Sequence, residues 1–143
     1  MLAALLLGLI AVAGNTPRGL AQLPASSPTW TPFHLIAANS DNAQVVKAGR
    51  SLLNAAQLSG VGSAPAYLKF YDTASSPTCG STAVKKSLMI PAAPTAANGG
   101  GSNTVSLGIN FFNGIAICVV TGIADTDDTA VAAATFNINF DYQ

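Results

Sequence analysis

The 143-residue sequence predicts an all-β fold: an antiparallel β-sandwich, jelly-roll-like or Ig-like, that follows an apolar N-terminal arm. Apolar and polar residues alternate through most of the chain after Pro32, which is typical of strands with one buried face. Clusters of Gly, Asn, Asp, Ser and Pro separate these short runs and mark the places where the chain reverses. Sandwiches and closed barrels share this spacing of strands and turns, so a closed barrel stays open as an alternative.

Charged residues are scarce. The chain has six Lys or Arg, six Asp and no Glu, and charged residues make up 8% of it, whereas about 25% is usual. So few Glu and Lys disfavour long exposed helices. A surface covered by other subunits explains this composition better than the alternative, a free surface kept soluble by Ser, Thr and Asn. The cations are scattered, with only Lys85 and Lys86 adjacent, so we expect no nucleic-acid partner.

The N-terminal segment 1–13 carries no polar side chain and is shorter than the ~20 residues that span a bilayer. We expect it to be an arm, with a short helix as one form of it, that is buried against partner subunits. A cleaved signal peptide and a membrane-inserted anchor are the alternatives. The side chains expected to dock are Leu2, Leu5, Leu6, Leu7, Leu9 and Ile10.

A linker follows the arm. Residues 19–32 contain three prolines, which fix φ and withhold backbone donors, so this stretch should be extended. Trp30 is the expected anchor of the linker onto the domain. We therefore divide the chain into an arm with its linker, residues 1–32, and a sandwich domain, residues 33–143.

Eight segments of the domain are candidate strands: 33–38, 44–47, 52–58, 66–72, 83–90, 105–111, 114–122 and 136–142. The last is the clearest, because Phe136, Ile138 and Phe140 alternate with polar residues. Segment 114–122 is apolar on both faces, which suits a central strand covered on both sides. Segment 52–58 is the least certain, because its alanines also tolerate a helical turn.

Segment 66–72 places Tyr67, Lys69 and Tyr71 on the same face of its strand. Tyr67 and Tyr71 together could form a carbohydrate platform, although packing in a core or an interface is the favoured use of such aromatics. The turn-forming residues that follow this strand predict a chain reversal, with Asp72 as a cap at the strand end.

The two cysteines, Cys79 and Cys118, lie too far apart for a CxxC motif and are too few for a disulfide framework or a zinc site. A bridge between them would stabilise the fold by about 4 kcal/mol in the loop-entropy model. The sequence alone nevertheless favours two free thiols over this bridge.

Candidate catalytic residues are few. The only histidine, His34, could form a thiolate pair with Cys79, but a strand-edge histidine and a turn cysteine are the favoured interpretation. The sequence has no G-x-S-x-G elbow, and it has no Glu for hydrolysis by paired carboxylates. We therefore predict a protein that is not an enzyme and needs no cofactor.

One acidic stretch is a weak metal candidate. Asp125, Asp127 and Asp128 offer hard oxygen ligands for calcium, although the stretch lacks the Gly and the downstream Glu of an EF-hand loop. Asp side chains also hold turns by accepting hydrogen bonds from nearby backbone N–H groups. The turn-forming use is the favoured one.

Several ordered motifs within residues 42–142 resemble a family of small virion proteins of tailed bacteriophages and prophages. They include "AYLKFYDTASSPTCGS" at 66–81, "GINFFNGIA" at 108–116 and "ADTDDTAV" at 124–131. The resemblance, which does not extend to residues 1–32, implies an all-β structural or decoration module without catalytic residues. Cys79 and Cys118 depart from the family, whose members have other small or apolar residues there.

The resemblance implies a non-enzymatic virion structural protein at the particle surface, either a capsid decoration (cement) protein or a spike subunit, and the charge-poor, β-rich composition fits this role. We expect it to act by assembly, as a homotrimer bound in many copies to the major capsid protein or other virion proteins. The first alternative is a receptor- or glycan-binding module of a phage fibre or spike. The second is a secreted bacterial β-domain with a cleaved leader.

Overall fold

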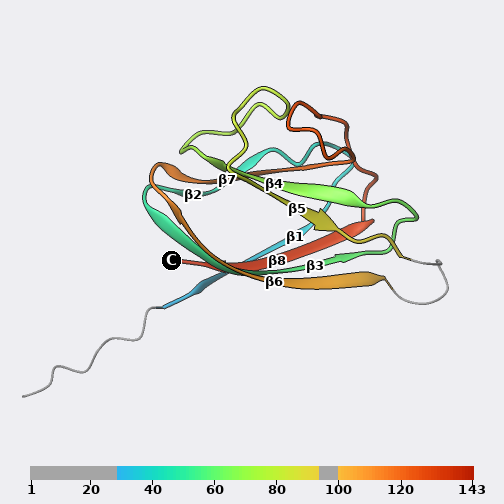
Figure 1. The fold of residues 1–143 in the computed structure, drawn as a ribbon, viewed down its shortest axis with the longest axis horizontal. Coiled ribbons are helices and arrows are strands. Elements are labelled where there is room, and N and C mark those ends of the chain that lie inside the picture. Colours follow the sequence, from blue (N-terminus) through green and yellow to red (C-terminus); the bar gives the residue numbers. More distant parts are fainter. Residues whose placement is uncertain (1–28, 94–99) are drawn as a thin grey trace, which may run out of the picture.

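The computed structural model describes residues 29–93 and 100–143, and the regular structure of this part is all β-strand (Figure 1). The predicted arm, with Leu2 to Ile10, lies outside the described residues. The eight strands are β1 (Thr31–Ile36), β2 (Gln44–Ala48), β3 (Ser51–Gly60), β4 (Ala66–Asp72), β5 (Lys86–Ile90), β6 (Gly101–Phe111), β7 (Gly114–Val120) and β8 (Phe136–Tyr142).

The strands form two four-stranded antiparallel sheets, which lie face to face in Figure 1. The first sheet has the order β1-β8-β3-β6 and the second sheet the order β2-β7-β4-β5. Counted along the chain, the first strand pairs with the last, and the pairing continues inward: β1 with β8, β2 with β7, β3 with β6 and β4 with β5. This nested pairing is that of a hairpin folded into a jelly roll. The structure therefore confirms the sandwich, selects its jelly-roll form and shows that the closed-barrel alternative is wrong.

The predicted strands agree with the observed ones at β4 and β8, whose bounds are those expected. Segment 52–58, which also tolerated a helical turn, belongs to the long strand β3. Strand β1 ends at Ile36, before the predicted end, because the Ala38 N–H turns away from β8 and donates to the Asn42 Oδ1 at 2.8 Å. Strand β5 begins only at Lys86, because residues 83–85 form no regular structure after the turn at 79–81.

The main core lies between the two sheets. The alternation predicted for β8 places Phe136, Ile138 and Phe140 in it, all buried. The ring of Phe140 stacks on Phe33 of β1 at 4.5 Å and meets Phe70 of β4 edge-on at 5.4 Å. These contacts tie the first sheet to the second across the core.

A further layer covers the outer face of the second sheet. It consists of residues 73–85, here called the disulfide loop, and residues 121–130, here called the acidic loop, and both lie beyond β4 and β7 in Figure 1. Beneath them is a second apolar cluster of Tyr71, Cys79, Ala116, Cys118 and Val120. Every residue of β7 is consequently buried, which confirms the prediction of a central strand covered on both sides.

The two loops approach each other closely at Gly80. This residue has a φ of +80°, and a Cβ there would lie 2.7 Å from the Thr126 carbonyl oxygen. Only glycine fits both the left-handed backbone and the close contact. Within residues 29–93 and 100–143, the structure contains no helix long and apolar enough to cross a membrane.

Candidate functional site

A fully buried lysine holds the acidic loop. Lys69 lies on the outer face of β4, opposite Cys118 of β7, and is 0% exposed. Its Nζ donates hydrogen bonds to the backbone carbonyl oxygens of Ala124 at 2.5 Å and Asp127 at 2.9 Å, with Asp125 at 3.4 Å. These carbonyls replace the water that a buried ammonium loses, so the loop backbone forms a cradle for an internal cation.

The carboxylate of Asp127 is used within the same loop. It accepts hydrogen bonds from the N–H groups of Gly122 and Thr129, both at 3.1 Å, and from the Thr129 hydroxyl at 3.3 Å. The turn-forming use of Asp127 is therefore confirmed. In the part of the chain that is described, no three His, Cys, Asp or Glu side chains gather to hold a metal ion. Asp125, Asp127 and Asp128 are therefore not gathered into one ligand group there, and calcium binding by this stretch stays a prediction.

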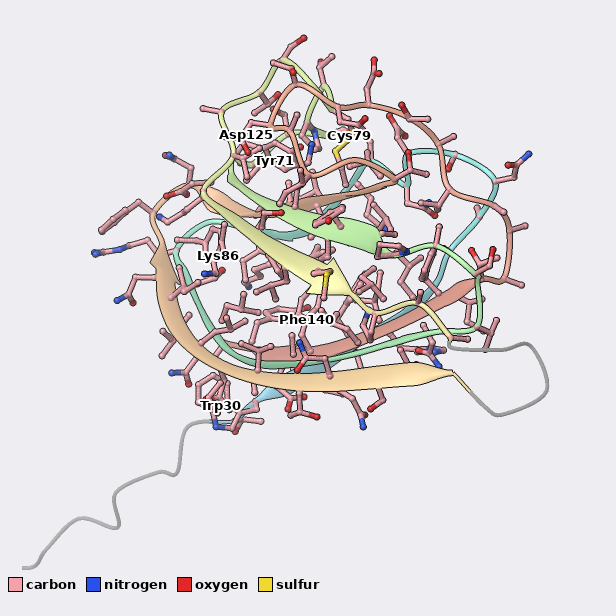
Figure 2. All side chains as sticks on the ribbon, turned by 45° about the vertical axis from the view of Figure 1, so that its right-hand side comes forward. Trp30, Tyr71, Cys79, Lys86, Asp125 and Phe140 are labelled. Carbon is pink, nitrogen blue, oxygen red and sulfur yellow. A yellow bond between two sulfur atoms is a disulfide. The ribbon has the colours of Figure 1, made fainter. Side chains whose placement is uncertain are left out.

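The two tyrosines do not form an exposed platform. Tyr71 is 0% exposed because the loops cover it, while Tyr67 is half-buried. Figure 2 shows Tyr71, Cys79 and Asp125 gathered on one side of the molecule. Burial, with smaller contributions from the charges of Asp125 and Asp41, raises the pKa of the Tyr71 phenol to about 12. The carbohydrate platform of Tyr67 and Tyr71 is therefore wrong, and packing is their use.

Cys79 and Cys118 are joined by a disulfide, so the expectation of two free thiols is wrong. Strand β7 points Cys118 outward from the second sheet, and the disulfide loop returns across that face, which brings the two Cα atoms to 6.1 Å. This separation suits a disulfide. The sequence could not indicate it, because the loop path that brings Cys79 over β7 has no local signal.

His34 and Cys79 do not meet. His34 is exposed on the outer face of the first sheet, whereas Cys79 is covered on the outer face of the second sheet. The sandwich therefore separates them, and Cys79 has no free thiol. Trp30, the expected anchor of the linker, is half-buried just before β1, and Figure 2 shows it on the far side of the molecule from Asp125.

One cluster was not anticipated. Phe112, in the turn between β6 and β7, is 60% exposed and lies between two cations. The Arg50 guanidinium carbon is 5.4 Å from its ring centroid and the Lys85 Nζ is 5.2 Å away, both within reach of cation–π attraction. We call these three residues the Phe112 cluster. Phe112 follows Arg50 by 62 positions, so the sequence had no local signal for it.

The carboxylate of Asp72 holds Lys85 and the backbone of Phe112 in place through hydrogen bonds. It accepts hydrogen bonds from the Lys85 Nζ at 2.7 Å and from the N–H groups of Phe112 at 2.9 Å and Asn113 at 2.7 Å. Partial burial alone would raise the pKa of Asp72, but the hydrogen bonds from Lys85, Asn113 and Phe112 outweigh it and lower the pKa to about 2. Asp72 ends β4 as predicted, but its carboxylate accepts from the N–H groups of the β6–β7 turn, which the prediction of a strand-end cap did not include.

Comparisons of the chain with protein-family models, with curated proteins and with solved structures find no match.

Proposed function

We propose that the chain is a structural subunit of a bacteriophage particle, a decoration (cement) protein or spike subunit that acts by assembly. The jelly-roll strand order carries this proposal, because jelly rolls recur in viral capsid and lectin domains. A fold alone does not determine function. The proposal therefore also depends on the motifs that resemble small virion proteins of tailed bacteriophages and prophages.

The motifs of the resemblance contact one another in the structure. Lys69, in the first motif, binds carbonyls of the stretch 124–131. Asp72, also in the first motif, binds N–H groups of the stretch 108–116. Segments far apart in sequence thus form one polar framework around the second sheet. Such a framework gives a physical reason for these motifs to occur together in one chain.

The surface offers anchors for assembly. An aromatic ring flanked by Arg and Lys, as in the Phe112 cluster, is the kind of group that concentrates binding energy in protein interfaces. The large apolar residues that are exposed in the described part are Ile36, Val45, Val61, Met89, Phe112 and Ile123. Burying such side chains contributes roughly 25 cal/mol per Å². Repetition over a homotrimer and a symmetric particle multiplies this affinity.

The disulfide agrees with this role. Disulfides persist outside the reducing cytosol, and the surface of a released particle is such a place. The same argument applies to the alternative of a secreted bacterial β-domain, so a test must separate the two.

Deletion of the arm provides that test. We propose that residues 1–23 dock into neighbouring subunits, and that the truncated protein remains a soluble folded domain but is no longer incorporated. Particles are assembled with full-length or truncated protein, and the copies per particle are compared by quantitative mass spectrometry. Normal copy numbers of the truncated protein would contradict the docking role. A mature particle-bound protein that lacks residues 1–23 would contradict it as well.

A further inference from the structure

The outer face of the first sheet carries a depression of about 380 Å³. This face points away from the second sheet and is the lower face of the molecule in Figure 1. The depression lies over the strands β1, β8 and β3 and reaches β6. The outward side chains that line it are Pro32, His34, Ala55, Gln57, Thr104, Asn139 and Asp141.

Strand register aligns four of these side chains in one row. His34 of β1 is opposite Asn139 of β8, Asn139 is opposite Gln57 of β3, and Gln57 is opposite Thr104 of β6. Paired residues of antiparallel strands point to the same face, and neighbouring strands are about 4.8 Å apart, so the row spans roughly 14 Å. An imidazole, two amides and a hydroxyl therefore form a continuous line of hydrogen-bonding groups.

A second row of aligned side chains, Pro32, Asp141 and Ala55, lies beside the first in the depression. Asp141 of β8 is opposite Pro32 on one side and Ala55 on the other. The small Ala55 and the flat ring of Pro32 leave room above the sheet, and the Asp141 carboxylate can accept two hydrogen bonds from a ligand. The Asn139 Nδ2 already donates to the Asn137 Oδ1 at 3.1 Å, which fixes the orientation of the Asn139 amide.

The lining restricts the chemistry of a ligand. Its only formal charge is that of Asp141, and all described Lys and Arg side chains lie elsewhere, on β2, β4 and β5 or in the turns beside them. A sulfated, phosphorylated or carboxylated ligand would lack a cation to pair with. None of the exposed large apolar side chains lines the depression, so a protein partner would lack an anchor there.

We propose that this face binds a neutral oligosaccharide, whose hydroxyl groups both donate to and accept from the Gln57 and Asn139 amides and donate to Asp141. Pro32 and Ala55 contact its C–H surfaces. The proposal goes beyond the assembly role and does not depend on it, because it concerns purified protein and a different surface from the Phe112 cluster.

The test uses the full-length protein on an array of neutral, sialylated and sulfated oligosaccharides, followed by calorimetric titration with the neutral glycan that gives the strongest signal. The expected result is binding to neutral glycans only. Gln57→Ala and Asn139→Ala should each weaken it about tenfold, because each removes hydrogen bonds to the ligand. Asn110→Ala is the matched control, since Asn110 is an exposed amide on the same sheet outside the depression.

Circular dichroism of each variant checks that it is folded. The proposal is overturned if no neutral glycan binds, if only sialylated or sulfated glycans bind, or if binding survives both substitutions. Equal loss on Asn110→Ala would also overturn it. Copy number in particles remains a separate readout, so failure of this proposal is distinguishable from failure of the assembly role.

Discussion

The Lys69 Nζ lies 2.9 Å from the Asp127 carbonyl oxygen, so a fully buried ammonium on β4 fixes a loop that follows β7. The same nitrogen binds the Ala124 carbonyl. The acidic loop therefore depends on one side chain from a strand that precedes it by more than fifty residues, 55 in the case of Ala124.

Replacing Lys69 with Met should lower the free energy of unfolding by about 1–3 kcal/mol, because the loop carbonyls lose their donor while the methionine still fills the space. Amide hydrogen exchange should accelerate in residues 121–130. Lys86→Met is the matched control, because Lys86 is exposed at the start of β5. Unchanged stability and unchanged exchange in Lys69→Met would show that the loop does not depend on this lysine.

Removing the disulfide by the double substitution Cys79→Ser and Cys118→Ser should lower the free energy of unfolding by about 4 kcal/mol in the loop-entropy model. The disulfide loop should lose exchange protection, since the bridge fastens it to β7. Denaturant melts with and without dithiothreitol provide the control, because the double variant should not respond to the reductant. A variant as stable as the oxidised wild type would refute the stabilising role of the bridge.

Asp72 should make stability depend on pH at the acid end. Its pKa falls from an ordinary 3.8 to about 2 in the folded protein, so its contribution is present above pH 3.8 and is lost as the pH falls to about 2. Asp72→Asn should lower stability at pH 7 and make the acid limb shallower. Lys85→Met should give part of this effect and Lys86→Met none, in chemical denaturation between pH 2 and pH 7. Parallel acid limbs in wild type and Asp72→Asn would contradict this assignment.

Tyr71 should make stability depend on pH at the alkaline end. Its hydroxyl is buried without a hydrogen-bond partner among the described residues, so Tyr71→Phe should stabilise the protein by about 1 kcal/mol. The pKa of Tyr71 is about 12 in the folded protein and has the ordinary value of 10.0 in the unfolded chain. The free energy of unfolding is therefore unaffected by this group below pH 10 and falls as the pH rises from 10 to about 12.

Chemical denaturation from pH 8 to pH 12 measures both effects. Tyr71→Phe should remove this alkaline loss, whereas Tyr67→Phe should leave it in place. Destabilisation by Tyr71→Phe at neutral pH would mean that the hydroxyl has a favourable partner.

The strands could be predicted because their information is local. Phe136, Ile138 and Phe140 alternate with polar residues, and this pattern alone determines which side of β8 faces the core. The position of Asp72 at the end of a strand was visible for a similar reason. Its acceptor role toward Phe112, 40 residues later, was not visible.

The loop layer could not be predicted because its contacts join distant segments. Lys69 sits between two tyrosines in a strand, a pattern that a solvated outer face would also show, and only the carbonyls of the acidic loop reveal that it is buried. The covered Tyr71 and the Cys79–Cys118 bridge have the same origin. The row from His34 to Thr104 likewise depends on the order of the strands in the sheet. The alternation of residues within a single strand carries no information about that order.

The central claim, that the chain is an assembled subunit of a phage particle, is tested most directly by locating it. Particles produced by the host that carries this sequence are purified and labelled with gold-conjugated antibody against residues 29–143, then imaged by electron cryomicroscopy. We predict many labels per particle in a regular arrangement at the surface. Purified particles that carry no label, with the protein found only in the cells or the medium, would contradict the account.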